Sequence, residues 1–127
     1  MKRLIVDLDD TVSFKLAESY KNAIPDMGFI KKLKRYKEEG FEIVINTSRN
    51  MRTYEGNIGK INKYTLPIIK EWLDIHLDFY DEIYVGKPWC GFDGFYIDDR
   101  AIRPREFMDN GYDEIKAILK NDSRREG

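Results

Sequence analysis

The apolar residues of the chain concentrate in four short runs, and the stretches between the runs have mixed or helical spacing. The runs are residues 4–6, 43–45, 83–85 and 95–97. Short runs rich in branched and aromatic residues, bounded by polar residues, predict buried strands. Buried strands that alternate with amphipathic helices predict a parallel sheet with helices on both faces. We therefore expect an α/β fold with a mostly parallel sheet.

Three stretches predict helices. The first starts at Asp26 as its N-cap and stops at Gly40, the second starts at Thr65 as its N-cap with Pro67 in its first turn, and the third follows Gly111. Apolar residues with helical spacing mark the three buried stripes: Phe29, Ile30, Leu33 and Tyr36; Ile68, Ile69, Trp72, Leu73, His76 and Leu77; Tyr112, Ile115, Ile118 and Leu119.

The segments without clear periodicity predict loops. Residues 12–25 predict a loop or a small hairpin over the end of the first strand, and residues 50–64 predict a long ordered loop. Long loops in compact domains are often functional. Residues 121–127 predict a frayed polar tail.

Length and composition narrow the class of protein. With 127 residues and 42% hydrophobic content, we expect one domain over residues 1–120. Lys and Arg (22) nearly balance Asp and Glu (23), so no overall field favours nucleic acid or an acidic membrane. The single cysteine, Cys90, excludes an internal disulfide. Without a signal-peptide core or a membrane-spanning run, we expect a soluble cytoplasmic protein.

Each apolar run is followed by residues that can carry chemistry. These are Asp7 and Asp9, then Thr47, then Lys87, then Asp98 and Asp99. Because ligands bind beyond the carboxyl ends of parallel strands, we expect these side chains to converge. Carboxylates without clustered histidines or cysteines favour Mg2+. A threonine and a lysine can bind phosphoryl oxygens, and one aspartate can attack phosphorus.

The ordered set resembles a known superfamily. Asp7-Leu8-Asp9-Asp10-Thr11 is similar to the first motif, Asp-x-Asp-x-Thr, of the haloacid dehalogenase (HAD) superfamily. Thr47, Lys87 and the pair Asp98-Asp99 resemble its second, third and fourth motifs, in the same order. The resemblance covers residues 7–99 and implies a Rossmann-like, HAD-like domain.

The resemblance also implies roles for these residues. Asp7 would be the nucleophile, and Asp9 would protonate the leaving group and then activate water. Asp7, the backbone carbonyl of Asp9 and Asp98 would hold Mg2+, with Asp99 as a ligand or bound through water. Thr47 and Lys87 would bind the phosphoryl group. Asp10 would support the turn.

The intervals between the motifs are too short for the cap domain that most members carry. A capless member closes its site by forming a homo-oligomer, or acts on large substrates. Residues 47–52, 86–91 and 96–100 are also similar to small phosphatases of capsule and polysaccharide biosynthesis. This implies a Mg2+-dependent phosphomonoesterase acting on a small phosphorylated metabolite such as a sugar or polyol phosphate.

Residues beside the motifs are candidates for substrate binding, and two other functions stay open. The candidates are Ser48, Arg49, Arg52, Tyr54, Asn57 and Trp89, besides Thr47 and Lys87. Ser48 is an alternative to Thr47 as the phosphate ligand. The other functions are a receiver-like phospho-acceptor domain, whose phosphorylated aspartate would lie on a middle strand, and a non-catalytic binding module.

Overall fold

The computed structural model describes residues 1–16 and 19–121. The chain divides into two compact units, Met1–Trp89 and Cys90–Gly127, and each is described by itself. All but the first residue of the tail predicted at 121–127 lies outside the described residues. Within the described part of the chain, no helix is long and apolar enough to cross a membrane.

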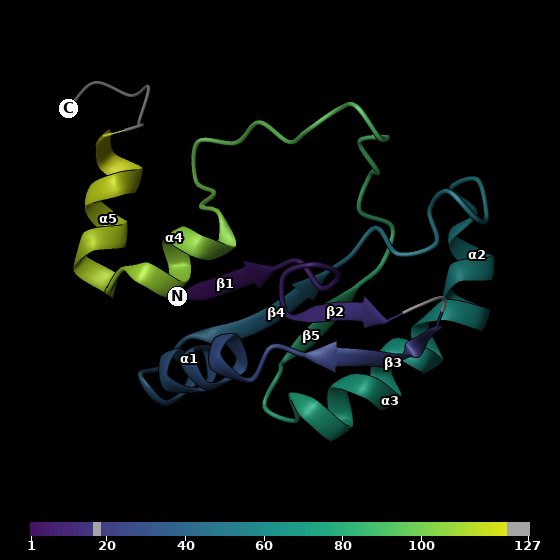
Figure 1. The fold of residues 1–127 in the computed structure, drawn as a ribbon, viewed down its shortest axis with the longest axis horizontal. Coiled ribbons are helices and arrows are strands. Elements are labelled where there is room, and N and C mark those ends of the chain that lie inside the picture. Colours follow the sequence, from purple (N-terminus) through teal and green to yellow (C-terminus); the bar gives the residue numbers. More distant parts are fainter. Residues whose placement is uncertain (17–18, 122–127) are drawn as a thin grey trace. The chain divides into compact units, whose positions relative to one another are not determined.

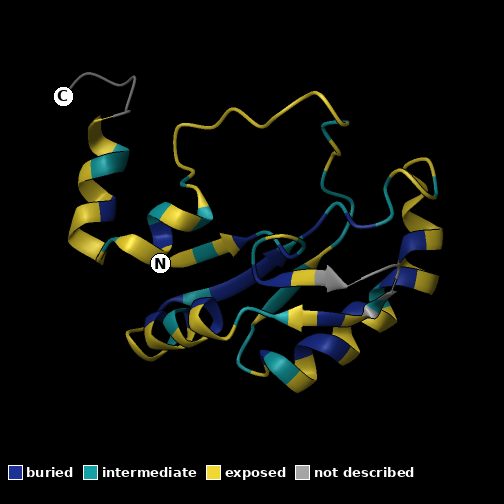
Figure 2. Cartoon of the chain, viewed as in Figure 1, coloured by how far each residue is buried: buried dark blue, intermediate teal, exposed yellow. Residues whose placement is uncertain are grey.

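The first unit is built on a three-stranded parallel sheet in the order β1-β4-β5 (Figure 1). The strands are β1 (Arg3–Val6), β4 (Glu42–Asn46) and β5 (Glu82–Tyr84). The central strand is the most deeply buried, because Ile43, Val44 and Ile45 are at most 1% exposed (Figure 2). The α/β class and three of the four predicted strands are confirmed.

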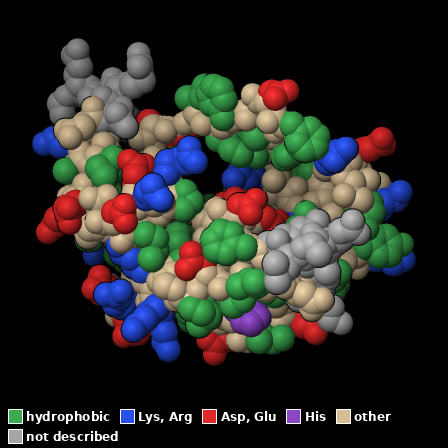
Figure 3. Space-filling view, in the orientation of Figure 1, with side chains coloured by type: hydrophobic (Ala, Val, Ile, Leu, Met, Phe, Trp, Pro, Cys, Tyr) green, Lys and Arg blue, Asp and Glu red, His purple; other side chains and the backbone are tan. Residues whose placement is uncertain are grey.

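Helix α1 (Met27–Glu38) connects β1 to β4 as predicted. The carboxylate of Asp26 accepts a hydrogen bond from the backbone N–H of Phe29 at 3.1 Å, which confirms the N-cap. The four predicted stripe residues are buried, and Gly40 follows the helix at φ +99°. The basic residues Lys31, Lys34 and Arg35 of α1 are exposed. Basic side chains gather at the lower left in Figure 3, so this face of the helix is a solvated surface.

Both helical connections lie on one face of the sheet (Figure 1). The strand order advances from β1 to β4 to β5, so right-handed crossovers place α1 and α3 (Leu66–His76) together. α3 buries Ile69, Trp72 and Leu73. Helical cover on the opposite face stays a prediction.

Residues 12–25 form a hairpin, which confirms one of the two interpretations of this segment. Strands β2 (Ser13–Leu16) and β3 (Ser19–Pro25) are antiparallel, with Ser13 opposite Pro25 and Phe14 opposite Ile24. The indole N–H of Trp72 donates to the carbonyl oxygen of Ala23 at 2.9 Å. This hydrogen bond links the hairpin to α3.

The prediction of a loop over residues 50–64 is wrong in its second half. Helix α2 (Ile58–Lys60) leads into a π-helical turn, η1 (Ile61–Thr65), and directly on into α3. The N-cap is Asn57, whose side chain accepts from the N–H of Lys60 at 3.1 Å. The predicted cap, Thr65, is helical and donates its hydroxyl to Asn50 at 2.7 Å.

Pro67 explains the error. Proline has no N–H to donate within a helix, so it usually marks a helix start. Here the wider π turn immediately precedes it, with the N–H of Leu66 donating to the carbonyl of Ile61. The helix therefore continues through a position that sequence reasoning takes as its beginning.

The second unit differs from the sequence prediction in two ways. Residues 95–97 form no strand, and the side chains of Phe95 and Ile97 are 76% and 89% exposed. The apolar run resembles a buried strand, but it pairs with none of the described strands. A helix that was not predicted, α4 (Pro104–Asp109), precedes the predicted α5 (Tyr112–Asn121). Phe107 and Ile115 are the buried residues of these helices.

Asp81 joins α1 to the sheet just before β5. Its carboxylate accepts from the ammonium of Lys37 at 2.7 Å and from the backbone N–H of Ile43 at 2.8 Å. The Lys37 hydrogen bond, helped by that of Ile43, lowers the pKa of Asp81 below its usual 3.8. A lowered carboxylate pKa stabilises the fold above the usual pKa and ceases to do so as pH falls through the folded value.

We expect Asp81→Ala to reduce the free energy of unfolding by about 1–2 kcal/mol at pH 7, because it removes two hydrogen bonds to one charged group. The difference should shrink as pH falls below 3.8. Urea unfolding at pH 7 and pH 3 measures both values. Asp78→Ala, which removes an exposed carboxylate from the same turn, is the matched control. A difference that stays constant with pH would contradict the assigned role of the charge.

Candidate functional site

A tight turn after β1 holds the first acidic cluster. The backbone N–H groups of Thr11, Val12 and Ser13 all donate to the carbonyl oxygen of Leu8, whose side chain is fully buried. Asp10 lies in the left-handed region at φ +59°, which aspartate tolerates better than most residues. The turn thus fixes Asp7 and Asp9 on either side of a buried leucine, and Asp10 supports it.

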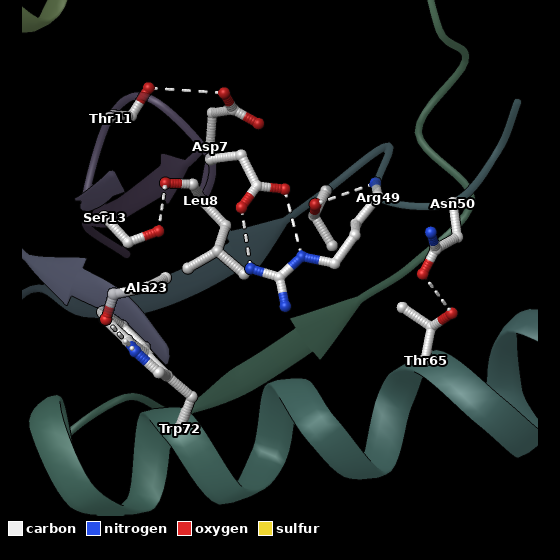
Figure 4. Close-up of polar contacts among 11 residues, drawn as sticks. Asp7, Leu8, Thr11, Ser13, Ala23, Arg49, Asn50, Thr65 and Trp72 are labelled. Atoms are coloured by element: carbon white, nitrogen blue, oxygen red, sulfur yellow. Dashed lines mark hydrogen bonds and ion pairs between the residues drawn. The ribbon is translucent and has the colours of Figure 1, made fainter. Parts of the chain in front are cut away.

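Asp7 lies between the hydroxyl of Thr11, which Figure 4 shows, and the ammonium of Lys87. Its Oδ2 accepts from the hydroxyl of Thr11 at 3.3 Å, and its Oδ1 lies 3.7 Å from Nζ of Lys87. Burial raises the pKa of Asp7 above 3.8, and the nearby Asp9 adds to the increase. Lys87, the N–H of Leu8 and the Thr11 hydroxyl oppose it. The ionised form of Asp7 is therefore costly in the fold, as is common at functional sites.

Backbone bonds bring Thr47 and Lys87 to neighbouring strand ends. The N–H of Thr47 donates to the carbonyl of Tyr84 at 2.9 Å, and the N–H of Lys87 donates to the carbonyl of Thr47 at 3.2 Å. Thr47 is 1% exposed, and its Oγ1 accepts from the N–H of Arg49 at 3.1 Å. Thr47 thus caps the following turn, and its hydroxyl hydrogen can still be donated to a ligand. Ser48 beside it is half-buried.

Gly86 allows the chain to turn between β5 and Lys87. Its φ of +85° lies in the region that favours glycine. A Cβ at this position would also lie 2.6 Å from Cδ1 of Ile58 in α2. The loop that carries Lys87 therefore packs closely against the helical start of the segment that follows Thr47.

Arg49, a predicted substrate ligand, contacts Asp9 instead. Its Nη2 and Nε donate to the two carboxylate oxygens of Asp9 at 2.7 and 3.1 Å. The whole residue is 4% exposed, and its guanidinium carbon lies 4.2 Å from the ring centre of Tyr20 in β3. Sequence reasoning missed Tyr20, because nothing marks one aromatic residue within a mixed segment.

The other predicted substrate residues have different settings. Arg52 is exposed and Trp89 is 39% exposed. Tyr54 packs near Tyr64 at a centroid distance of 5.9 Å, and Asn57 caps α2. Asn57 therefore has a structural role, while Arg52 and Trp89 are accessible to a ligand.

The predicted metal carboxylates are divided between the two units. Asp98 and Asp99 are exposed residues of the second unit, and Asp98 accepts from the N–H of Arg100 at 2.9 Å. In the described part of either unit, no three His, Cys, Asp or Glu side chains gather to hold a metal ion. A site that joins Asp7 to Asp98 and Asp99 stays a prediction.

An open cavity of about 360 Å³ lies within the first unit, beside Lys87. Its lining comes from all three strands and the loop after β5, including Asn46 and Lys87. The cavity runs along the face of the sheet past Ile5 and Val44, and Lys87 borders both this cavity and the carboxylate of Asp7.

Comparison with known proteins places the chain in a family. No protein-family model matches it, and no curated protein sequence does. A crystal structure of a target protein from Vibrio cholerae is 58% identical, covers 97% of this chain and 100% of its own, and has a TM-score of 0.93. The chain belongs to the family of that protein. The Vibrio cholerae protein shares the α/β fold described above, and the similarity assigns no activity.

Proposed function

We propose that the chain is a capless, HAD-type phosphomonoesterase that depends on Mg2+ and forms an aspartyl-phosphate intermediate. Its substrate is a small phosphorylated metabolite, such as a sugar or polyol phosphate used in capsule or polysaccharide biosynthesis, in the cytoplasm. The observation that carries the proposal is the meeting of three motif residues. Oδ1 of Asp7 lies 3.7 Å from Nζ of Lys87, and the backbone N–H of Lys87 donates a hydrogen bond to the carbonyl oxygen of Thr47.

Asp7 and Asp9 divide the reaction between them. A carboxylate oxygen of Asp7 forms a bond to phosphorus while the bond to the leaving oxygen breaks, and Asp9 gives its proton to that oxygen. Water then forms a bond to phosphorus, Asp9 takes a proton from it, and the bond to Asp7 breaks. Inorganic phosphate leaves, and both aspartates return to their initial states.

Lys87 and Thr47 serve the transferred group. The Lys87 ammonium is close to Oδ1 of Asp7, so it can draw a phosphoryl group to that oxygen and balance its charge. The buried hydroxyl of Thr47 is a second donor at the same strand edge. Exposed Arg52, half-buried Ser48 and Trp89 are the candidates for contacting the rest of the substrate.

The predicted metal ligands have the type of ligand atom that a hard cation such as Mg2+ binds. They supply only oxygen ligands, and the burial that raises the pKa of Asp7 creates a need for positive charge beside it. Asp7, the backbone carbonyl of Asp9 and Asp98 would hold Mg2+, with Asp99 as a ligand or bound through water. The ion would supply charge balance between the carboxylates and the phosphoryl group.

Neither interval between the motifs forms a cap. Among the described residues, the first interval adds only the β2-β3 hairpin to α1 and β4, and the second adds a turn, α2 and η1 to α3 and β5. An open site of this kind is completed by a second copy of the chain or by a large substrate, and a small substrate favours the second copy.

Phosphate release tests the function. We expect the purified chain to hydrolyse p-nitrophenyl phosphate and members of a panel of sugar, polyol and nucleotide phosphates in the presence of Mg2+. Chelation with EDTA should remove this activity, and added Mg2+ should restore it. No turnover on the panel, or turnover that EDTA leaves unchanged, would contradict the assignment.

The receiver-like alternative conflicts with the residues at the end of the middle strand. Such a domain would carry its phosphorylated aspartate on a middle strand, and the middle strand here, β4, ends in Asn46 and is followed by Thr47. A long-lived phosphoprotein without turnover would favour that alternative. A non-catalytic module would not need the costly ionised form of Asp7.

A further inference from the structure

We propose that Arg49 is a positioning residue that fixes the carboxylate of Asp9 for proton transfer, with Tyr20 covering its guanidinium group. The inference rests on the proposed function and assigns Arg49 a different role from substrate binding. Its basis is a contact that the motif pattern does not contain: a buried guanidinium paired through two bonds with the second aspartate of the first motif.

The contact between Arg49 and Asp9 fixes an orientation as well as a charge. Two parallel bonds, of 2.7 and 3.1 Å, join the planar guanidinium to both oxygens of the carboxylate (Figure 4). Such bidentate pairs have defined geometry, which a lysine cannot reproduce. The Asp9 side chain is still 27% exposed, so it is held in place without being closed off from solvent.

Arg49 is itself held on several sides. Its backbone N–H donates to Oγ1 of Thr47, and its guanidinium lies over the ring of Tyr20. Its third guanidinium nitrogen, Nη1, is buried and has no hydrogen-bond partner among the described residues. In Figure 4 this nitrogen points away from the carboxylate.

An unsatisfied donor on a buried charge is costly, and such a group in a folded protein calls for a functional reason. Two guanidinium nitrogens of Arg49 donate to Asp9, and the third, Nη1, is left without a partner among the described residues. A residue that served only stability would not need a charge at a site that is 1% exposed. Orientation of Asp9 explains both the burial and the pairing.

Direct binding of substrate by Arg49 does not fit this setting. The two guanidinium nitrogens that face the motif residues, Nε and Nη2, already donate to the carboxylate of Asp9. Lys87, with a side chain 22% exposed, and the exposed Arg52 are cations more accessible to a phosphate. Arg49 therefore acts through Asp9.

Kinetics of Arg49→Met, Asp9→Asn and the double variant on p-nitrophenyl phosphate test the proposal. For Arg49→Met we expect kcat to fall about 100-fold, the size typical of general acid–base catalysis, and KM to change by less than about threefold. The double variant should be no slower than Asp9→Asn alone, because the two residues act as one unit. Arg35→Met, which removes an exposed guanidinium from α1, should leave all values unchanged.

The amount of phosphoenzyme separates positioning from a loss of folded protein. Nitrophenolate leaves readily without an acid, so a displaced Asp9 mainly slows hydrolysis of the aspartyl-phosphate. We expect acid-quenched Arg49→Met to retain a higher fraction of phosphoenzyme than the wild type does, as in Asp9→Asn. Should Arg49→Met fail to fold, Arg49→Lys is expected to show the same pattern, since it keeps the charge and loses the two-bond geometry.

Four results would overturn the inference. Full activity in Arg49→Lys would show that charge alone is needed, and a tenfold higher KM with kcat unchanged would show substrate binding. A further rate loss in the double variant would show independent roles, and a phosphoenzyme fraction no higher than in the wild type would show a structural role. Absence of turnover in the wild type would instead remove the proposed function, and the inference with it.

Discussion

Asp7→Asn is expected to reduce kcat for phosphomonoester hydrolysis by about 10⁵-fold, the scale seen when a catalytic nucleophile is removed. Asparagine keeps the shape of the side chain but cannot attack phosphorus. The Oδ1 that lies 3.7 Å from Lys87 is the atom from which the attack begins in the proposed reaction. The measurement is steady-state phosphate release with Mg2+, together with the absence of an acid-stable phosphoenzyme.

The same substitution should stabilise the fold at neutral pH. The pKa of Asp7 is raised, chiefly by burial, so folding favours the protonated carboxyl group. That contribution to stability is present below 3.8 and is lost as pH rises through the folded value. We therefore expect a higher melting temperature for Asp7→Asn than for the wild type at pH 7 without Mg2+, and a smaller difference near pH 3.5.

Asp10→Asn is the matched control for both measurements. It makes the same chemical change three residues along, at a left-handed position that asparagine tolerates, and should leave turnover intact. Loss of activity accompanied by a lower melting temperature in Asp7→Asn would point to misfolding. Turnover that persists in Asp7→Asn would rule out Asp7 as the nucleophile.

The second large effect is expected at Lys87. Lys87→Met should lower kcat/KM by about 10²- to 10³-fold, because it removes the ammonium that balances charge where the phosphoryl group is transferred. The substitution should also move the acid limb of the pH–rate profile to higher pH. Lys87 lowers the pKa of Asp7, so without it a higher pH is needed to ionise the nucleophile.

The pH dependence of kcat/KM for Lys87→Met, wild type and Lys87→Arg measures this effect. Lys87→Arg keeps the charge, so it should retain part of the wild-type rate. The acid limb of its pH–rate profile should lie at the same pH as in the wild type. Lys34→Met, on the exposed side of α1, is the control. An increase in KM alone, with the limb unmoved, would show that Lys87 binds substrate without influencing Asp7.

Much of the first unit is predictable from the sequence, because local rules and burial agree there. The apolar run 43–45 becomes the buried central strand, and Asp26 caps α1 as its position predicts. The run 95–97 has the same pattern but stays exposed. An apolar run shows that a strand is possible, whereas strand formation also requires a neighbour with which to pair.

Sequence reasoning predicts the relative positions of three motif residues but not the side-chain partners of the residues around them. The order of Asp7, Thr47 and Lys87 along the chain is enough to place them at neighbouring strand ends. The pairing of Arg49 with Asp9 joins residues 40 positions apart. No local rule specifies which of several nearby charges a buried arginine meets, since this depends on how the hairpin and β4 pack.

The close approach of Gly86 and Ile58 constrains how this family can vary. A side chain at position 86 would need a backbone that leaves φ +85°, and its Cβ would displace the end of the Ile58 side chain, since the two atoms would otherwise lie 2.6 Å apart. The end of a partly exposed side chain can move, whereas a left-handed backbone strains any residue with a Cβ. Among related chains, glycine at position 86 should therefore be kept more strictly than isoleucine at position 58, and its loss should accompany a different path for the segment that carries the lysine.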